Sequence, residues 1–230
     1  TLFRKNAMNN AVLFDLDGTL LDTAPDFIIA VNQLRRDHNL ENLSDETITV
    51  QVSNGSVVLT QLALNITPEE PGFASARQQL LDYYLACIGT RSGLFSGYKS
   101  LLSALKNAGI AWGIVTNKPL LYSKALLEKI KLANDCDVLI CPDHVDKPKP
   151  DPAGLLLAAK KLQCTSDNII YVGDHQRDIE AGNRAGMKTI AVAFGYIEPC
   201  DNINTWQADF IAEQTKDIKP IVESVFSCKI

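Results

Sequence analysis

Residues 11–22, AVLFDLDGTLLD, place two aspartates directly after a short apolar run. The run 11–14, AVLF, is typical of a buried strand. In an extended backbone, residues i and i+2 face the same way, so Asp15 and Asp17 are expected to project together from the end of that strand. Carboxylates held there without partners are costly, and a divalent cation with an anionic substrate is their natural partner.

The aspartate pair has two other interpretations, an acidic turn after a strand and a calcium loop. A calcium loop that begins at Asp15 needs glycine at its sixth position and glutamate at its twelfth. In this chain Gly18 is fourth and Asp26 is twelfth. The spacing excludes the calcium loop, whereas the acidic turn stays open on this stretch alone.

The composition of the whole chain excludes some classes of function. The 230 residues are 46% apolar and 21% charged, which suits one large globular domain or two smaller ones. The net charge of -5 gives no basic field for a nucleic acid. Apolar stretches are shorter than the ~20 residues of a membrane helix, and the run 11–14 is too short for a signal peptide. We therefore expect a cytoplasmic protein without a membrane or nucleic-acid partner.

The six cysteines are scattered through the chain without a CxxC pair. The closest two, Cys136 and Cys141, have no histidine pair that would complete a zinc site. Free thiols in a reducing compartment are the expected state.

Apolar runs rich in β-formers alternate with helical stretches along most of the chain. This alternation predicts an α/β fold with a Rossmann-like parallel sheet and crossover helices. The expected strands are 11–14, 111–115, 138–140, 169–172, 189–192 and 210–211. The expected helices between them are 98–108, 120–131, 152–162, 176–185 and 218–226.

The region 22–95 differs from the rest because it has almost no strand signal. Its helical patterns cover residues 27–38, 45–52, 57–64 and 74–88. We therefore predict a catalytic core formed by residues 1–21 and 96–230, with an all-helical cap domain, 22–95, inserted after the first strand.

Polar clusters follow four of the expected strands. They are Asp15 with Asp17, 116–118 (TNK), 147–152 (KPKPDP) and 173–178 (GDHQRD). A single cluster has a simple explanation, such as a helix cap at Thr116 or a solvated lysine. Ligands of open α/β sheets collect at the carboxyl ends of the strands, so four clusters at one edge predict a functional site.

The assembled pattern resembles the haloacid dehalogenase superfamily of phosphotransferases over essentially the whole chain. The matching strings are DLDGTLLDT (15–23), VTNKP (115–119), KPDP (149–152) and YVGDHQRDIEAG (171–182). The resemblance implies the haloacid dehalogenase fold, Mg²⁺ as cofactor and a small phosphorylated metabolite as substrate.

The resemblance also implies roles for the acidic residues. Asp15 would be the nucleophile that forms an aspartyl-phosphate, and Asp17 would be the general acid and base. Asp15, the backbone carbonyl of Asp17 and Asp174 would hold Mg²⁺. Asp178 would support the metal site, and Gly18 would let the backbone turn tightly.

The phosphate would be bound by Thr116, Asn117 and a lysine. Both Lys147 and Lys149 precede proline, so the motif alone leaves two candidates. Lys149 stands at the distance before Asp174 that the resemblance implies, and Lys147 is kept as the alternative.

Within the superfamily the chain resembles the phosphoglycolate phosphatase branch. A finer resemblance, to N-acetylmuramic acid 6-phosphate phosphatases, rests on WGIVTNKP (112–119), CPDHV (141–145) and GYIEPCDN (195–202). The implied function is hydrolysis of a small phosphomonoester such as 2-phosphoglycolate or N-acetylmuramic acid 6-phosphate.

Other activities of the superfamily fit less well. Dehalogenases lack the second aspartate, which is present here as Asp17. Phosphonate-cleaving members use a cap lysine, and no lysine occurs in 22–95. A sugar phosphomutase shares the aspartate pair and stays open as the alternative function.

The cap offers candidates for substrate contact. Ser53, Asn54 and Gly55 are expected to form a polar loop that faces the site. Possible anion contacts are Arg35, Arg36, Arg77 and Arg91, most of which we expect to lie on solvated helix faces. His175, beside Asp174, is expected to support the site or face solvent rather than bind a ligand. The sequence leaves open whether the chain is a monomer or a homodimer.

Overall fold

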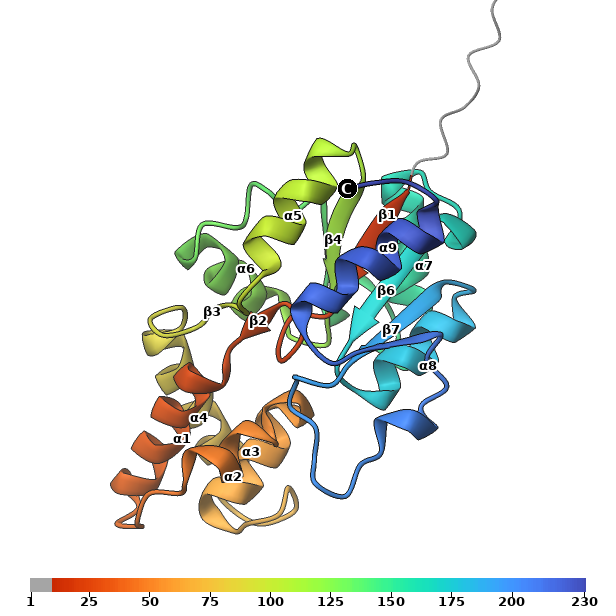
Figure 1. The fold of residues 1–230 in the computed structure, drawn as a ribbon. Helices are drawn as coiled ribbons and strands as arrows, with labels where there is room; N and C mark the ends of the chain where they lie inside the picture. The colour runs from red at the N-terminus through yellow and green to blue at the C-terminus, as the bar shows by residue number, and fades with distance from the viewer. Residues whose placement is uncertain (1–9) are drawn as a thin grey trace, which may run out of the picture.

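The computed structural model describes residues 10–230, with a six-stranded parallel sheet at its centre (Figure 1). The strand order is β5-β4-β1-β6-β7-β8. The strands are β1 Ala11–Phe14, β4 Ala111–Val115, β5 Val138–Ile140, β6 Ile169–Gly173, β7 Lys188–Val192 and β8 Phe210–Ala212. The predicted α/β fold with a parallel sheet is confirmed. Residues 1–9, the start of the predicted core segment 1–21, lie outside the described residues.

Helices cover both faces of the sheet. They are α5 Tyr98–Asn107, α6 Leu120–Lys129, α7 Ala153–Leu162, α8 Gln176–Arg184 and α9 Ile218–Phe226. Val12 and Phe14 of β1 belong to the apolar cluster that contains residues of α5 and α9. Ala11 and Leu13 belong to the cluster with α7 and α8. Because side chains alternate along a strand, Asp15 continues the side of β1 that faces α7 and α8.

Four further helices lie together beyond the sheet, at the lower left of Figure 1. They are α1 Ala24–Asp37, α2 Asp45–Thr49, α3 Gly55–Leu64 and α4 Phe73–Cys87. The predicted helix 45–52 ends at Thr49, and a 3₁₀ turn, Val52–Asn54, precedes α3. The expected polar loop is therefore a tight turn followed by the first residue of α3, Gly55, whose φ is +81°. The domain boundaries at 22 and 95 stay a prediction.

Two very short strands connect these helices to the sheet. β2, Leu21–Asp22, pairs in antiparallel fashion with β3, Gly93–Leu94. A strand of two residues carries no readable periodicity, which is why the sequence did not predict it. This pairing places side by side the two segments in which the chain passes between the sheet and the four helices.

A buried carboxylate fastens the same junction. Asp26, in the first turn of α1, is 0% exposed. Its oxygens accept the backbone N–H of Gly89 at 2.7 Å and that of Arg91 at 2.9 Å. They also accept the hydroxyls of Thr90 and Ser92. Asp26 therefore holds the start of α1 against the segment that leads from α4 into β3.

Two expectations drawn from composition concern membranes and thiols. Within residues 10–230, no helix combines the length and the apolarity that a membrane-spanning helix requires. All six cysteines fall in this range and carry free thiols.

We predict that Asp26→Ala lowers the free energy of unfolding by about 3 kcal/mol, because the buried hydroxyl of Ser92 and the partly buried N–H groups of Gly89 and Arg91 lose their acceptor. Urea titration followed by circular dichroism measures the change. Asp82→Ala, at an exposed position on α4, is the control and should change stability by less than about 0.5 kcal/mol. Equal losses in the two variants would contradict the role given to Asp26.

Candidate active site

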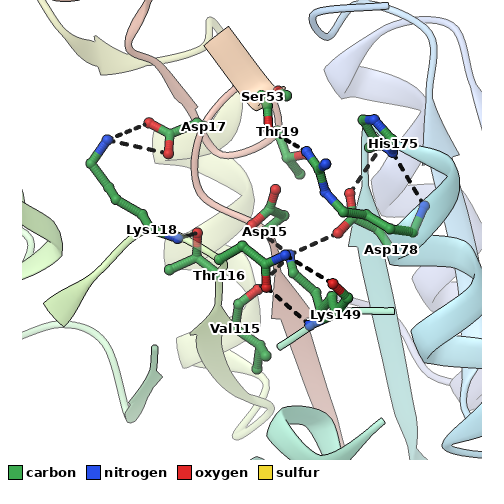
Figure 2. A network of polar contacts seen from close by, with 12 residues as sticks. Asp15, Asp17, Thr19, Ser53, Val115, Thr116, Lys118, Lys149, His175 and Asp178 are labelled. Carbon is green, nitrogen blue, oxygen red and sulfur yellow. Dashed lines mark hydrogen bonds and ion pairs between the residues drawn. The ribbon is translucent and has the colours of Figure 1, made fainter. Parts of the chain in front are cut away.

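The predicted polar clusters meet at the carboxyl edge of the sheet (Figure 2). Asp15 follows β1, Thr116 follows β4 and Asp174 follows β6, while Lys149 lies in the loop before α7. All four side chains are buried. Because β1 pairs in parallel with both β4 and β6, their ends bring residues from distant parts of the chain to one place.

The structure distinguishes the two candidate lysines. Lys147 is exposed, whereas Lys149 is 5% exposed and reaches the aspartates. Its Nζ lies 2.7 Å from Oδ1 of Asp15 and 2.7 Å from Oδ1 of Asp178. Burial lowers the pKa of Lys149, but the two carboxylates outweigh burial and raise the pKa above its usual value. The group is therefore an ammonium ion between two carboxylates.

The residues after β4 support this lysine. The side-chain amide of Asn117 donates to the backbone carbonyl of Lys149 at 3.0 Å. It also accepts the backbone N–H of Lys149 at 3.0 Å. The Asn117 side chain thus positions Lys149, and its predicted contact with phosphate stays a prediction. Thr116 lines the cavity beside Asp15, where its hydroxyl accepts the backbone N–H of Lys118 at 3.1 Å.

Three buried carboxylates crowd together at the ends of β1 and β6. Asp15, Asp174 and Asp178 each offer one oxygen, and these oxygens lie within 4.8 Å of one another. Burial, followed by the nearby charges of Asp15 and Asp178, raises the pKa of Asp174 to about 7. Its oxygens accept the hydroxyl of Thr19 at 2.9 Å and the backbone N–H of Tyr196 at 2.9 Å.

This donor set fits a hard divalent cation. Mg²⁺ prefers carboxylate and carbonyl oxygens in near-octahedral geometry, and a cation would offset the two causes that raise the pKa of Asp174, its burial and the nearby negative charges. The predicted metal ligands are Asp15, Asp17 and Asp174, with Asp178 in a supporting role. The structure gathers the Asp178 carboxylate with Asp15 and Asp174. The backbone carbonyl of Asp17 as a ligand stays a prediction.

Gly18 is required where the chain turns beneath this cluster. Its φ is +77°, in the left-handed region that favours glycine. A Cβ on Gly18 would collide with Oδ2 of Asp174 and lie 2.8 Å from the ring of Tyr196. The glycine therefore permits both the turn and the close approach.

The carboxylate of Asp17 points away from the acidic cluster (Figure 2). Lys118 Nζ lies 2.9 Å from its Oδ1 and 3.2 Å from its Oδ2. The hydroxyl of Thr23 donates to Oδ1 at 2.6 Å. The sequence analysis gave Lys118 and Thr23 no role, although Lys118 stands within the motif string 115–119.

A cavity of about 290 Å³ opens next to Asp15 and Asp17. Ser53, Asn54 and Gly55, predicted to face the site, line it from the other side. The lining also includes aromatic and cationic side chains, those of Phe27, Tyr84, Tyr122, Arg77, Lys118 and Arg177.

The four cap arginines lie in different surroundings, and one of them lines the cavity. Arg77 lines the cavity, and its Nε donates to the hydroxyl of Ser56 at 2.9 Å. Arg35 instead donates to the backbone carbonyl of Ala63 at 2.6 Å, and Arg36 and Arg91 are exposed. Arg36 therefore lies on a solvated helix face as expected, whereas Arg91 lies beyond the end of α4 and Arg35 is half-buried.

The turn before α3 contacts the sheet domain directly. The hydroxyl of Ser53 donates to Oδ2 of Asp174 at 3.3 Å, and the guanidinium of Arg177 donates to the backbone carbonyl of Ser53. The amide of Asn54 donates to Glu198 at 2.8 Å. Sequence reasoning missed Arg177 and Glu198, because each contacts a partner more than a hundred residues away.

His175 forms the start of α8. Its Nδ1 accepts the backbone N–H of Arg177 at 3.2 Å, and its ring stacks on Trp206. Burial, and then the charge of Arg177, lower the pKa of His175 to about 4. The imidazole is therefore a neutral helix cap.

The arrangement has known counterparts. The sequence model of the haloacid dehalogenase-like hydrolases matches residues 12–192. The chain belongs to this family. The solved structures that resemble it include one named "predicted phosphoglycolate phosphatase" from Haemophilus somnus, with a TM-score of 0.83 and 28% identity over 94% of this chain and 99% of that one.

Curated relatives of the chain are phosphatases. It is 40% identical over 214 residues to N-acetylmuramic acid 6-phosphate phosphatase of Pseudomonas putida, covering 93% of this chain and 96% of the relative. It is 38% identical over 208 residues to phosphoglycolate phosphatase of Xanthomonas campestris pv. campestris, covering 89% and 92%. The resemblance derived from the sequence, and the enzyme class of phosphoric monoester hydrolase, are confirmed.

We predict that Mg²⁺ raises the midpoint of thermal unfolding of the wild-type protein, by about 5 °C at roughly 100 times its Kd. Asp174→Asn should lose most of this increase because one of the three carboxylates is removed. Differential scanning calorimetry with and without Mg²⁺ measures the shift.

The exposed Asp146 supplies the control, since Asp146→Asn removes an acidic charge away from the cluster. That variant should keep the full increase with Mg²⁺. An Asp174→Asn protein that responds to Mg²⁺ like the wild type would exclude this cluster as the binding site.

Proposed function

We propose that the protein is a Mg²⁺-dependent phosphomonoesterase that uses Asp15 as its nucleophile. The observation that carries the proposal is the contact of the Lys149 ammonium group with Asp15 and Asp178, beside a cavity that also contains Asp17. A carboxylate cannot approach a phosphate dianion unless positive charge offsets the repulsion between them. Lys149 supplies part of that charge from the chain itself.

In the first half of the reaction, Asp15 attacks phosphorus and the bond to the leaving oxygen breaks. The hydroxyl of Thr116 and the ammonium of Lys149 hold the oxygens of the transferred group. Asp17, on the cavity side, gives its proton to the departing alkoxide. When bound, Mg²⁺ supplies further charge neutralisation at the phosphoryl oxygens.

In the second half, the aspartyl-phosphate on Asp15 is hydrolysed. Asp17, now ionised, takes a proton from water, and the resulting hydroxide attacks phosphorus. The bond to Asp15 breaks, phosphate is released, and both aspartates return to their initial protonation states. The contacts of the 53–54 turn with Asp174 and Glu198 close the site against bulk water during these steps.

The proposed substrate is N-acetylmuramic acid 6-phosphate, with 2-phosphoglycolate as the second candidate. Relatives with both names lie at 38–40% identity. A cavity of about 290 Å³ has room for a sugar ring, and the half-buried ring of Tyr122 offers an apolar face for it. Arg77, at the rim, suits a carboxylate remote from the phosphate.

We predict that Asp15→Asn lowers phosphate release by at least about 1,000-fold, because the nucleophile is lost while its shape is kept. A panel of N-acetylmuramic acid 6-phosphate, 2-phosphoglycolate and common sugar phosphates with Mg²⁺ provides the assay, and circular dichroism checks the fold. Failure of the wild-type protein to release phosphate from any member would refute the proposed function. Conversion of glucose 1-phosphate without phosphate release would indicate the phosphomutase instead.

We predict that Arg77→Met raises KM for N-acetylmuramic acid 6-phosphate by about tenfold, the effect of one charge-assisted hydrogen bond. N-acetylglucosamine 6-phosphate lacks the lactyl carboxylate, so its KM should change less than about twofold if that bond is the one lost. Arg36→Met is the matched control, since Arg36 is exposed on α1. Parallel changes for the two sugars would show that Arg77 does not recognise the carboxylate.

A further inference from the structure

Lys118 is a buried lysine whose charged end contacts Asp17. The residue is 7% exposed, and its Nζ lies within 3.2 Å of both carboxylate oxygens of Asp17. Burial of an ammonium group is costly unless a counter-charge and hydrogen bonds accompany it. Ionised Asp17 provides both, and when Asp17 carries the proton of the first half-reaction its carbonyl oxygen can still accept a hydrogen bond from Lys118, so the two side chains fix each other (Figure 2).

The other side of Lys118 is covered by two aromatic rings. Phe27 of α1 and Tyr84 of α4 stack with their centroids 3.9 Å apart. Lys118 Nζ lies 4.8 Å from the centroid of Phe27 and 4.6 Å from that of Tyr84. These distances are in the range of cation–π attraction, which strengthens when the cation is removed from water.

The two rings come from helices beyond the sheet, whereas Lys118 and Asp17 follow strands of the sheet. The environment of the ammonium group therefore exists only while α1 and α4 lie against the carboxyl edge. If these helices withdraw, water reaches Lys118, and its pairing with Asp17 weakens because both charges become hydrated.

Thr23 holds the same carboxylate from the base of α1. Its hydroxyl donates to Oδ1 of Asp17 at 2.6 Å, and its backbone N–H donates to the hydroxyl of Tyr196 at 2.6 Å. Together, Thr23 and Lys118 keep Asp17 turned toward the cavity and away from Asp15, Asp174 and Asp178. The cavity side is where a leaving group bonded to a phosphate at Asp15 would lie.

We propose that Lys118 is a positioning residue that holds Asp17 toward the leaving group only while the rings of Phe27 and Tyr84 cover it. This inference rests on the proposed phosphatase function. It makes transfer of a proton to the leaving oxygen conditional on closure of α1 and α4 over the site. Lys118 acts through Asp17, and the reaction itself remains that of Asp15 and Asp17.

We predict that Lys118→Met slows the reaction most for those substrates whose leaving group must be protonated as it departs. With the faster of N-acetylmuramic acid 6-phosphate and 2-phosphoglycolate, kcat and the single-turnover rate of leaving-group release should both fall by about 100-fold, the usual contribution of a general acid. With p-nitrophenyl phosphate, whose leaving anion is stable without a proton, the single-turnover rate of p-nitrophenol release should fall by less than about fivefold, because that first half-reaction needs no acid. Asp17→Asn provides the benchmark and should show the same contrast in leaving-group release, since its role as base in the second half-reaction is common to both substrates.

Three further variants complete the test. Lys118→Arg keeps a cation next to both oxygens and should recover part of the lost kcat. Tyr84→Leu removes one covering ring and should reproduce the contrast in weaker form. Lys124→Met changes an exposed lysine on α6 and should leave both substrates unaffected.

Several results would overturn the inference. Equal losses in the single-turnover rate of leaving-group release for the two substrates would show that Lys118 is merely structural, and a change confined to KM would make it a substrate-binding group. If Lys118→Met does not fold by circular dichroism, Thr23→Val must show the same contrast for the inference to stand. Absence of phosphate release by the wild-type protein would instead refute the proposed function.

Discussion

The crowding of Asp15, Asp174 and Asp178 is the constraint around which the site is built. Their oxygens lie within 4.8 Å of one another in a buried place, where like charges repel strongly. Lys149 offsets part of this repulsion, and the Asn117 amide fixes the backbone of Lys149 on both of its polar groups. The sheet order provides the geometry, since β1 lies between β4 and β6.

Local patterns were sufficient to predict the sheet and the residues at its edge. Each strand of the sheet is a short, mainly apolar run. Three of the polar clusters follow their strands directly in sequence, and the fourth, 147–152, follows β5 after a 3₁₀ turn, Pro142–His144, so neither pattern depends on distant contacts. The choice between Lys147 and Lys149 rests on spacing and on burial. The spacing before Asp174 favours Lys149, and the folded loop agrees, since Lys149 is buried and Lys147 is exposed.

The parts that sequence could not predict are those whose partners are remote. Tyr196 accepts the backbone N–H of Thr23 and of Ala24 and donates to Asp22 at 2.6 Å, across more than 170 positions. Lys118 is similar, because the contacts that suggest its role are with Asp17 and with the aromatic rings of two other helices, which are all remote from it in sequence. The tight turn before α3 was expected to be a loop, since three polar residues carry no signal for a 3₁₀ turn.

The junction formed by β2, β3 and Asp26 lets the helical insertion change while the residues at the edge of the sheet are kept. It closes the helical insertion at its own base, because Asp26 binds the segment 89–92 and β2 pairs with β3. The helices between these points can therefore change in sequence or length without displacing Asp15 or Lys149. A lineage that keeps Phe27 and Tyr84 over Lys118 can keep one phosphoryl chemistry and change the other residues that meet the leaving group. Much of the insertion can therefore vary between related proteins, because the buried carboxylate of Asp26 holds its two ends together.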